Sequence, residues 1–128
     1  MKRLLAAAAF FTLLPAEARA TEWMICSAGE AVSFSVLLGA MDVIAVNDIK
    51  IAANGKKWST SPGEGTLITR GQAFETADQM WIDVTDEGMG KVVAQLRLFK
   101  ADANDTYAVG GTLRIDGEGA WAVACDGP

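Results

Sequence analysis

Apolar and polar residues alternate along most of the chain beyond residue 20, and turn-forming residues interrupt this alternation every eight to twelve positions. A period of two is typical of strands with one buried face, and regular interruptions at this spacing are typical of antiparallel sheets. Residues 32–39 form one such strand, and Met80, Ile82 and Val84 form the apolar side of another. The pattern predicts an all-β fold, namely a small antiparallel β-barrel or sandwich of about eight strands.

The dipeptide Asn54-Gly55 separates two of the predicted strands and is a strong signal for a tight hairpin. A two-residue turn at this point pairs Ile51 with Trp58, which places both side chains on the buried face of the sheet. The alternation weakens after this hairpin, and residues 72–78 fit a loop or a single helical turn.

The segment 91–100 suits either a helix or a strand by composition. A five-residue loop before the segment aligns Ile82 with Ala94, and a four-residue loop after it aligns Ala94 with Leu113. Both loops place the same side chains on the buried face, and agreement between two independent connections favours a strand.

The two cysteines lie near the two ends of the predicted domain, Cys26 in its first strand and Cys125 in its last. Neither belongs to a C-x-x-C motif, so a structural disulfide is favoured over a redox pair. A bond between them makes the N- and C-terminal strands neighbours. That arrangement closes the sheet into a barrel and removes its two exposed edges.

Residues 1–20 have the three parts of a secretory signal peptide. Lys2 and Arg3 form the basic region, residues 4–14 form an apolar run that a single Thr interrupts, and an Ala-Arg-Ala motif ends at residue 20. An eleven-residue apolar run is too short to span a bilayer as a helix. We expect cleavage after residue 20, a single β domain over 21–128 located in the periplasm or secreted, and no membrane insertion after cleavage.

Composition and charge exclude several classes of function. The chain has no His, which removes Ser-His-Asp and Cys-His catalysis and histidine zinc sites. Its formal charge is −5, and without residues 1–20 it has 8 basic and 15 acidic residues. An acidic protein is a poor match for nucleic acid or an anionic membrane. With no nucleophile, base or metal-ligand constellation, the sequence predicts a non-enzymatic domain without a metal or cofactor.

The expected strand pairings leave a set of aromatic and polar side chains on the outside of the sheet. Trp81 alternates with Met80 and Ile82 and therefore points away from the core. The candidate binding face comprises Trp81, Asp83, Gln95, Arg97, Phe99, Gly110, Thr112 and Arg114. Trp and Arg are enriched at binding surfaces, and Arg can bind a carboxylate by donating two hydrogen bonds to it. The alternative is a solvated sheet surface with scattered apolar residues, which is common in monomeric proteins.

These observations predict an exported, non-enzymatic binding module for an unidentified protein or small ligand. The layout of a signal peptide, an early Cys in the first strand, short strands and a late Cys resembles that of the small periplasmic barrels that inhibit C-type lysozyme. The Ser- and Lys-containing inhibitory motifs of that family are not present in this chain. The resemblance implies an alternative function, inhibition of a lysozyme-like exported or host enzyme, and an acidic domain would suit a cationic lysozyme.

A further alternative is an envelope hydrolase that uses carboxylates. Asp83, Asp86 and Glu87 cluster around one predicted turn, and paired carboxylates can hydrolyse glycosides across a cleft. Such an enzyme would need at least one Asp or Glu in a buried environment that shifts its pKa.

Overall fold

The computed structural model describes residues 21–39 and 43–127, so the predicted signal peptide lies outside the described residues. Over these ranges no helix is long and apolar enough to cross a membrane. The described part of the chain consists of strands joined by turns and loops. In chain order they are β1 (Glu22–Ala28), β2 (Val32–Gly39), β3 (Ala45–Ala53), β4 (Lys56–Ser59), β5 (Thr66–Glu75), β6 (Gln79–Asp86), β7 (Val92–Ala103), β8 (Thr106–Ile115) and β9 (Gly119–Asp126).

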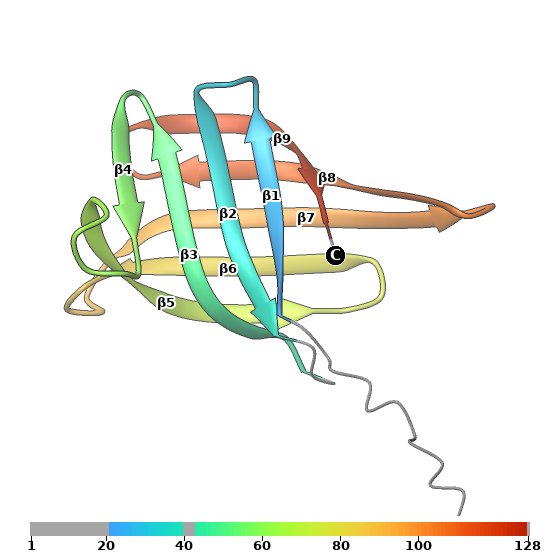
Figure 1. The fold of residues 1–128 in the computed structure, drawn as a ribbon, viewed down its shortest axis with the longest axis horizontal. Helices are drawn as coiled ribbons and strands as arrows, with labels where there is room; N and C mark the ends of the chain where they lie inside the picture. The colour runs from blue at the N-terminus through green and yellow to red at the C-terminus, as the bar shows by residue number, and fades with distance from the viewer. Residues whose placement is uncertain (1–20, 40–42, 128) are drawn as a thin grey trace, which may run out of the picture.

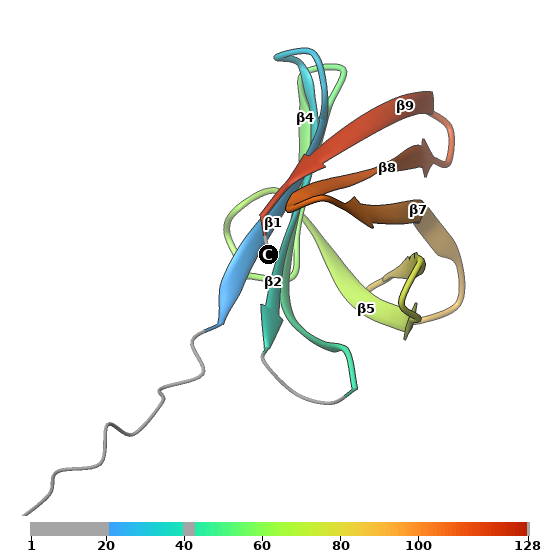
Figure 2. The same cartoon turned by 90° about the vertical axis from the view of Figure 1, so that its right-hand side faces the viewer.

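Consecutive strands are hydrogen-bonded neighbours, and β1 pairs with β9, so the sheet closes into a barrel. In Figures 1 and 2, strands β1–β4 cross β6–β8 steeply, and the barrel is flattened into two layers around a common core. The predicted all-β fold is confirmed. Closure of the sheet also decides between the two architectures that the sequence left open, a barrel and a sandwich.

In β2, β6 and the barrel part of β7, alternate side chains point into the core, as the period of two predicts. Trp58 is only 8 % exposed and faces Ile51 across the hairpin at Asn54-Gly55, in the predicted register. Both turn residues have positive φ, 52° and 75°, as a tight two-residue hairpin requires. The buried apolar residues are Met24, Cys26, Val32, Phe34, Val36, Ile49, Ile51, Ala53, Trp58, Ile68, Met80, Ile82, Val84, Ala94, Leu96, Leu98, Val109, Leu113, Ile115 and Val123.

The seam between β1 and β9 is held by the predicted disulfide. Cys26 and Cys125 lie directly opposite each other across the two strands and are bonded. The pairing of β1 with β9 covers three residue pairs, fewer than any other antiparallel pairing of the barrel. The disulfide therefore reinforces the shortest antiparallel seam.

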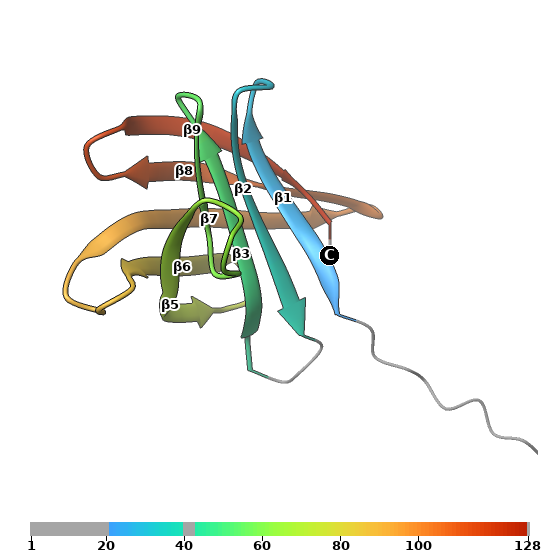
Figure 3. The same cartoon turned by 60° about the vertical axis from the view of Figure 1, so that its left-hand side comes forward.

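The seam between β4 and β5 is parallel, unlike every other pairing, and covers two residue pairs. Two parallel strands run in the same direction, so β5 must begin beside the start of β4. Residues 60–65 therefore carry the chain from the end of β4 back along this strand. Figure 3 shows this connection returning beside β4 before β5 begins. The return path places a loop against the outer side of the barrel.

The prediction of a loop or helical turn over 72–78 is wrong, because β5 continues to Glu75. The strand is irregular between Arg70 and Ala73, where its register against β6 shifts. Gly71 lies in this bulge, and a Cβ there would be 2.7 Å from the carbonyl oxygen of Asp83. The bulge interrupts the period of two, so the second half of the strand did not match the strand pattern.

The predicted register between β6 and β7 is wrong by two residues: Ile82 faces Leu96 rather than Ala94. The amide of Asp86 donates a hydrogen bond to the carbonyl of Lys91 at 3.0 Å, which leaves a turn of four residues, and a bulge at Val93 in β7 follows this turn. The turn is one residue shorter than predicted and the bulge adds one residue, so the two together shift the pairing by two residues. A shift of two residues keeps every side chain on its predicted face, so the strand assigned to this segment is correct while its partners change.

The predicted register between β7 and β8 is also wrong by two residues, since Ala94 faces Ile115 rather than Leu113. The connection is a two-residue turn at Asn104-Asp105, not a four-residue loop. Both residues have positive φ, 51° and 63°, a conformation that Asn and Asp tolerate better than most side chains. The tight turn extends both strands.

Polar contacts at Glu118 connect the β8–β9 turn with the β3–β4 turn. The carboxylate of Glu118 accepts a hydrogen bond from the side-chain amide of Asn54 at 3.0 Å and another from the ammonium of Lys56. These two hydrogen bonds, that of Asn54 first, hold the pKa of Glu118 below its ordinary value of 4.5. The contact is therefore fully formed above pH 4.5 and is lost as the pH falls through the lowered pKa.

We expect an NMR titration of the Glu118 carboxyl group to give a midpoint below 4.5 in the wild type. Replacement Asn54→Gly removes the amide but keeps the positive φ, so the midpoint should rise towards 4.5. Asp116 is the internal control, because the hydrogen bond from Lys91 lowers its pKa and Asn54 is not among the causes. A Glu118 midpoint that does not respond to Asn54→Gly would show that this link does not form in solution.

Candidate functional site

The candidate binding face lies on the outer side of β6, β7 and β8. Its residues form rows of directly paired positions across these strands. The rows are Phe99 and Gly110; Trp81, Arg97 and Thr112; and Asp83, Gln95 and Arg114. The structure therefore brings all the residues of the predicted face to one surface.

Trp81 is the centre of this face. It is 46 % exposed although the flanking Met80 and Ile82 are buried. The guanidinium carbon of Arg97 lies 5.1 Å from the centroid of the Trp81 ring, in a cation–π arrangement. An ion pair of 2.8 Å between Arg97 Nη2 and Asp83 Oδ1 holds the guanidinium in turn. Trp81 is thus fixed from one side by two charged residues that neutralise each other.

Phe74 fixes Trp81 from the other side and was missed by the sequence analysis. The two rings are 6.0 Å apart between centroids and meet edge to face. Phe74 falls within 72–78, the segment predicted as a loop. In the structure the amide of Thr76 donates to the carbonyl of Gln79, which makes a tight turn and pairs Phe74 with Trp81. A tight turn assumed at this point of the sequence would have placed Phe74 beside Trp81. We call Phe74, Trp81 and Arg97 the aromatic cluster.

Arg114 belongs to the face but not to the aromatic cluster. Its guanidinium donates to the amide oxygen of Gln95 at 3.2 Å and lies 3.7 Å from a carboxylate oxygen of Asp116. Asp116 also pairs with Lys91, which lowers the pKa of Asp116 below its ordinary value. The part of the face around Arg114 is therefore a network of paired charges.

The strands beside the aromatic cluster have small outward side chains. Thr112 lies opposite Arg97, and Ala122 on β9 lies opposite Thr112. One row further along, Gly110 lies opposite Ala124. The cluster consequently stands above a low, apolar stretch of sheet that a second surface can approach closely.

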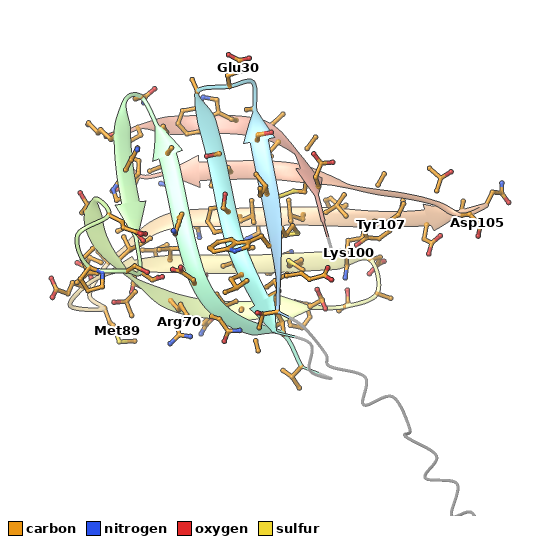
Figure 4. The ribbon with its side chains drawn as sticks, viewed as in Figure 1. Glu30, Arg70, Met89, Lys100, Asp105 and Tyr107 are labelled. Carbon is orange, nitrogen blue, oxygen red and sulfur yellow. A yellow bond between two sulfur atoms is a disulfide. The ribbon has the colours of Figure 1, made fainter. Side chains whose placement is uncertain are left out.

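The β7–β8 hairpin projects beyond the barrel as a two-stranded arm, residues 101–108 (Figures 1 and 4). Every residue of the arm is exposed, including Asp102, Asp105 and Tyr107. Partial burial raises the pKa of the Tyr107 hydroxyl, and the nearby carboxylates of Glu75 and Asp102 add to the rise. The arm extends the outer surface of β7 and β8 away from the barrel.

The carboxylates that suggested hydrolysis make contacts within the fold. Asp83 pairs with Arg97, and Asp86 accepts a hydrogen bond of 2.9 Å from the amide of Gly90 in its own turn. Over residues 21–39 and 43–127 no three His, Cys, Asp or Glu side chains are grouped so as to hold a metal ion.

Comparisons with protein-family models, with curated proteins and with solved structures found no match to this chain. What the chain itself defines is a disulfide-closed β-barrel with an aromatic cluster on the outside of three strands.

Proposed function

We propose that this protein is an exported, non-enzymatic binding module that recognises a partner protein through the aromatic cluster. The observation that carries the proposal is the environment of Trp81. This side chain is half exposed, yet Phe74 holds it on one side and Arg97, itself paired with Asp83, on the other. An ordered aromatic side chain costs little conformational entropy when a partner covers it.

The composition of the cluster also fits a protein interface. Binding energy at such interfaces is concentrated in a few Trp, Tyr and Arg residues near the centre of the contact. The small residues on β8 and β9 leave room for a partner surface around Trp81. Small-molecule sites, in contrast, are concave, whereas this cluster stands out from the sheet.

The disulfide and the charge support the remaining parts of the proposal. A structural disulfide is typical of an oxidising, exported compartment, in agreement with the predicted signal peptide. Without residues 1–20 the protein has 8 basic and 15 acidic residues, and this acidic excess favours a cationic partner, because opposite charges accelerate association and suppress wrong contacts.

The decisive experiment compares two tryptophan variants. The oxidised protein is used to isolate its partner from envelope extract, and the dissociation constant of the purified pair is then measured. Replacement Trp81→Ala should weaken binding by about 30-fold or more, the equivalent of a hot-spot loss of about 2 kcal/mol. The matched control is Trp23→Ala, because Trp23 is exposed to a similar extent, 39 %, but lies on β1.

The control should bind as tightly as the wild type, and both variants should keep the fold. Failure to isolate any partner, or equal dissociation constants for wild type and Trp81→Ala, would overturn the proposal. The face would then be a solvated sheet surface.

A further inference from the structure

A groove of about 580 Å³ lies on the outer side of β2, β3 and β4, on a different part of the barrel from the aromatic cluster. Its volume is in the range of small-molecule sites. The residues that matter for its chemistry are Ser33, Ser35, Lys50, Lys57, Glu64 and Gly65. They come from three strands and from the loop 60–65 that returns beside β4.

The loop forms a fixed wall of the groove. Ser59 is the one buried polar residue within the described part of the chain, 1 % exposed, and its hydroxyl accepts a hydrogen bond of 3.0 Å from the amide of Ser61. The same hydroxyl donates to Glu64 at 3.3 Å. Gly65 has a φ of +121°, and a Cβ there would lie 2.5 Å from the carbonyl oxygen of Lys57. Only glycine allows the loop to approach β4 this closely.

Lys57 gives the groove a positive charge that no carboxylate of the described residues neutralises within 4 Å. Six of the eight Lys and Arg residues in the described ranges have a carboxylate within 4 Å, and Lys57 is not among them. Lys50, in the same groove, pairs with Glu64 at 3.1 Å. In an acidic protein, an unneutralised ammonium group beside a preformed groove is a feature that favours an anion.

Two hydroxyl groups face the groove from β2. Ser33 lies in the row of paired positions that leads through Ala52 to Lys57, and Ser35 lies opposite Lys50. Among the hydrogen bonds of the described residues, none engages the hydroxyl of Ser33 or Ser35. An ammonium group with neighbouring hydroxyl donors is a suitable set for the oxygens of a carboxylate or phosphate.

We propose that this groove is a second binding site, which takes a small molecule by its oxyanion. The ammonium group of Lys57 anchors the anion, and the hydroxyls of Ser33 and Ser35 donate hydrogen bonds to it. The pair of Lys50 with Glu64 keeps the loop wall in place. The site is independent of the aromatic cluster and of the partner proposed for it.

The test uses the ¹⁵N-labelled, oxidised protein purified after export. It is titrated at constant ionic strength with citrate, glucose 6-phosphate and, as a neutral control, glucose. At least one of the two anions should give saturable shifts of the amides of Ser33, Ser35, Lys57 and Gly65, and glucose should give none. The two anions distinguish a carboxylate ligand from a phosphate ligand.

Two matched variants then test the anchor. Lys57→Gln should weaken binding of the tighter-binding anion at least tenfold. Lys56→Gln, which removes the same charge one residue away, should change the affinity for this anion less than twofold. The double variant Ser33→Ala/Ser35→Ala should also weaken binding of this anion. Trp81→Ala should leave anion binding unchanged, so failure of this site and failure of the partner site are separable. Absence of saturable shifts with both anions, or equal weakening by Lys57→Gln and Lys56→Gln, would overturn the proposal.

Discussion

Replacement of both Cys26 and Cys125 by alanine is expected to lower the free energy of unfolding by about 4–5 kcal/mol. The two residues are 99 positions apart, and a cross-link over so long a loop removes much of the conformational freedom of the unfolded chain. The seam that the disulfide reinforces has only three residue pairs, so little else holds the first strand to the last. Equilibrium denaturation by urea measures the difference between the oxidised wild type and the double variant.

Reduction of the wild-type protein is the matched control, because it breaks the bond without changing the volume of the buried Cys26 side chain. The reduced protein should lose nearly as much stability as the double variant. A thiol assay on the oxidised protein, unfolded in urea, should detect no free thiol. Equal urea midpoints for the oxidised and reduced proteins would show that the disulfide adds no stability.

Replacement Trp58→Ala is expected to lower the free energy of unfolding by about 3–5 kcal/mol, the usual cost of deleting a large buried aromatic side chain. Trp58 packs in the core cluster and is the only buried apolar residue on β4. That strand has four residues and only two residue pairs with β5. Loss of the indole therefore leaves a cavity and also removes the main attachment of β4 to the core.

Trp81→Ala is the matched control for this variant, since it deletes the same side chain from the outside of the barrel. Its effect on the free energy of unfolding should stay within about 1 kcal/mol, mainly from lost contacts with Phe74 and Arg97. If Trp81→Ala destabilised the protein as much as Trp58→Ala, the aromatic cluster would be a structural element and not a binding surface.

The direction in which side chains point was predictable, whereas the partners of each strand were not. Met80 and Val84 are buried and Trp81 is exposed, as a period of two requires. The pairings of Ile82 and Ala94 were each wrong by two residues. Whether a side chain points into the core depends only on its odd or even position along one strand. The register between two strands also depends on the length of the turn and on bulges, so one bulge or one pair of residues with positive φ can change it.

The same limits apply to the candidate binding face. Its residues were predictable as a set, because all of them occupy the alternate positions of three strands whose side chains point outward. The contact of Trp81 with Arg97 depends on the register, since the predicted alignment would place Gln95 opposite Trp81. The bulge at Gly71 kept Phe74 out of the predicted face altogether.

The groove was not predictable from any periodic pattern. It depends on the path of residues 60–65, which return along β4 and pair β5 in parallel with it. The two glycines of this loop indicate a turn, but only the close contact of Gly65 with Lys57 defines where the loop lies. Long-range packing of this kind leaves no local signal in the sequence.

The β7–β8 arm has a consequence for how the protein behaves at high concentration. The pairing of β1 with β9 closes the sheet, but β6 pairs with β7 only as far as Phe99, and β9 pairs with β8 only from Val109. The arm beyond these residues offers free strand edges, which are templates for edge-to-edge aggregation. Its outward residues are mostly small, and Asp102 and Asp105 bring like charges together when two arms stack. The acidic arm thereby opposes amyloid-like assembly at this pair of strand edges.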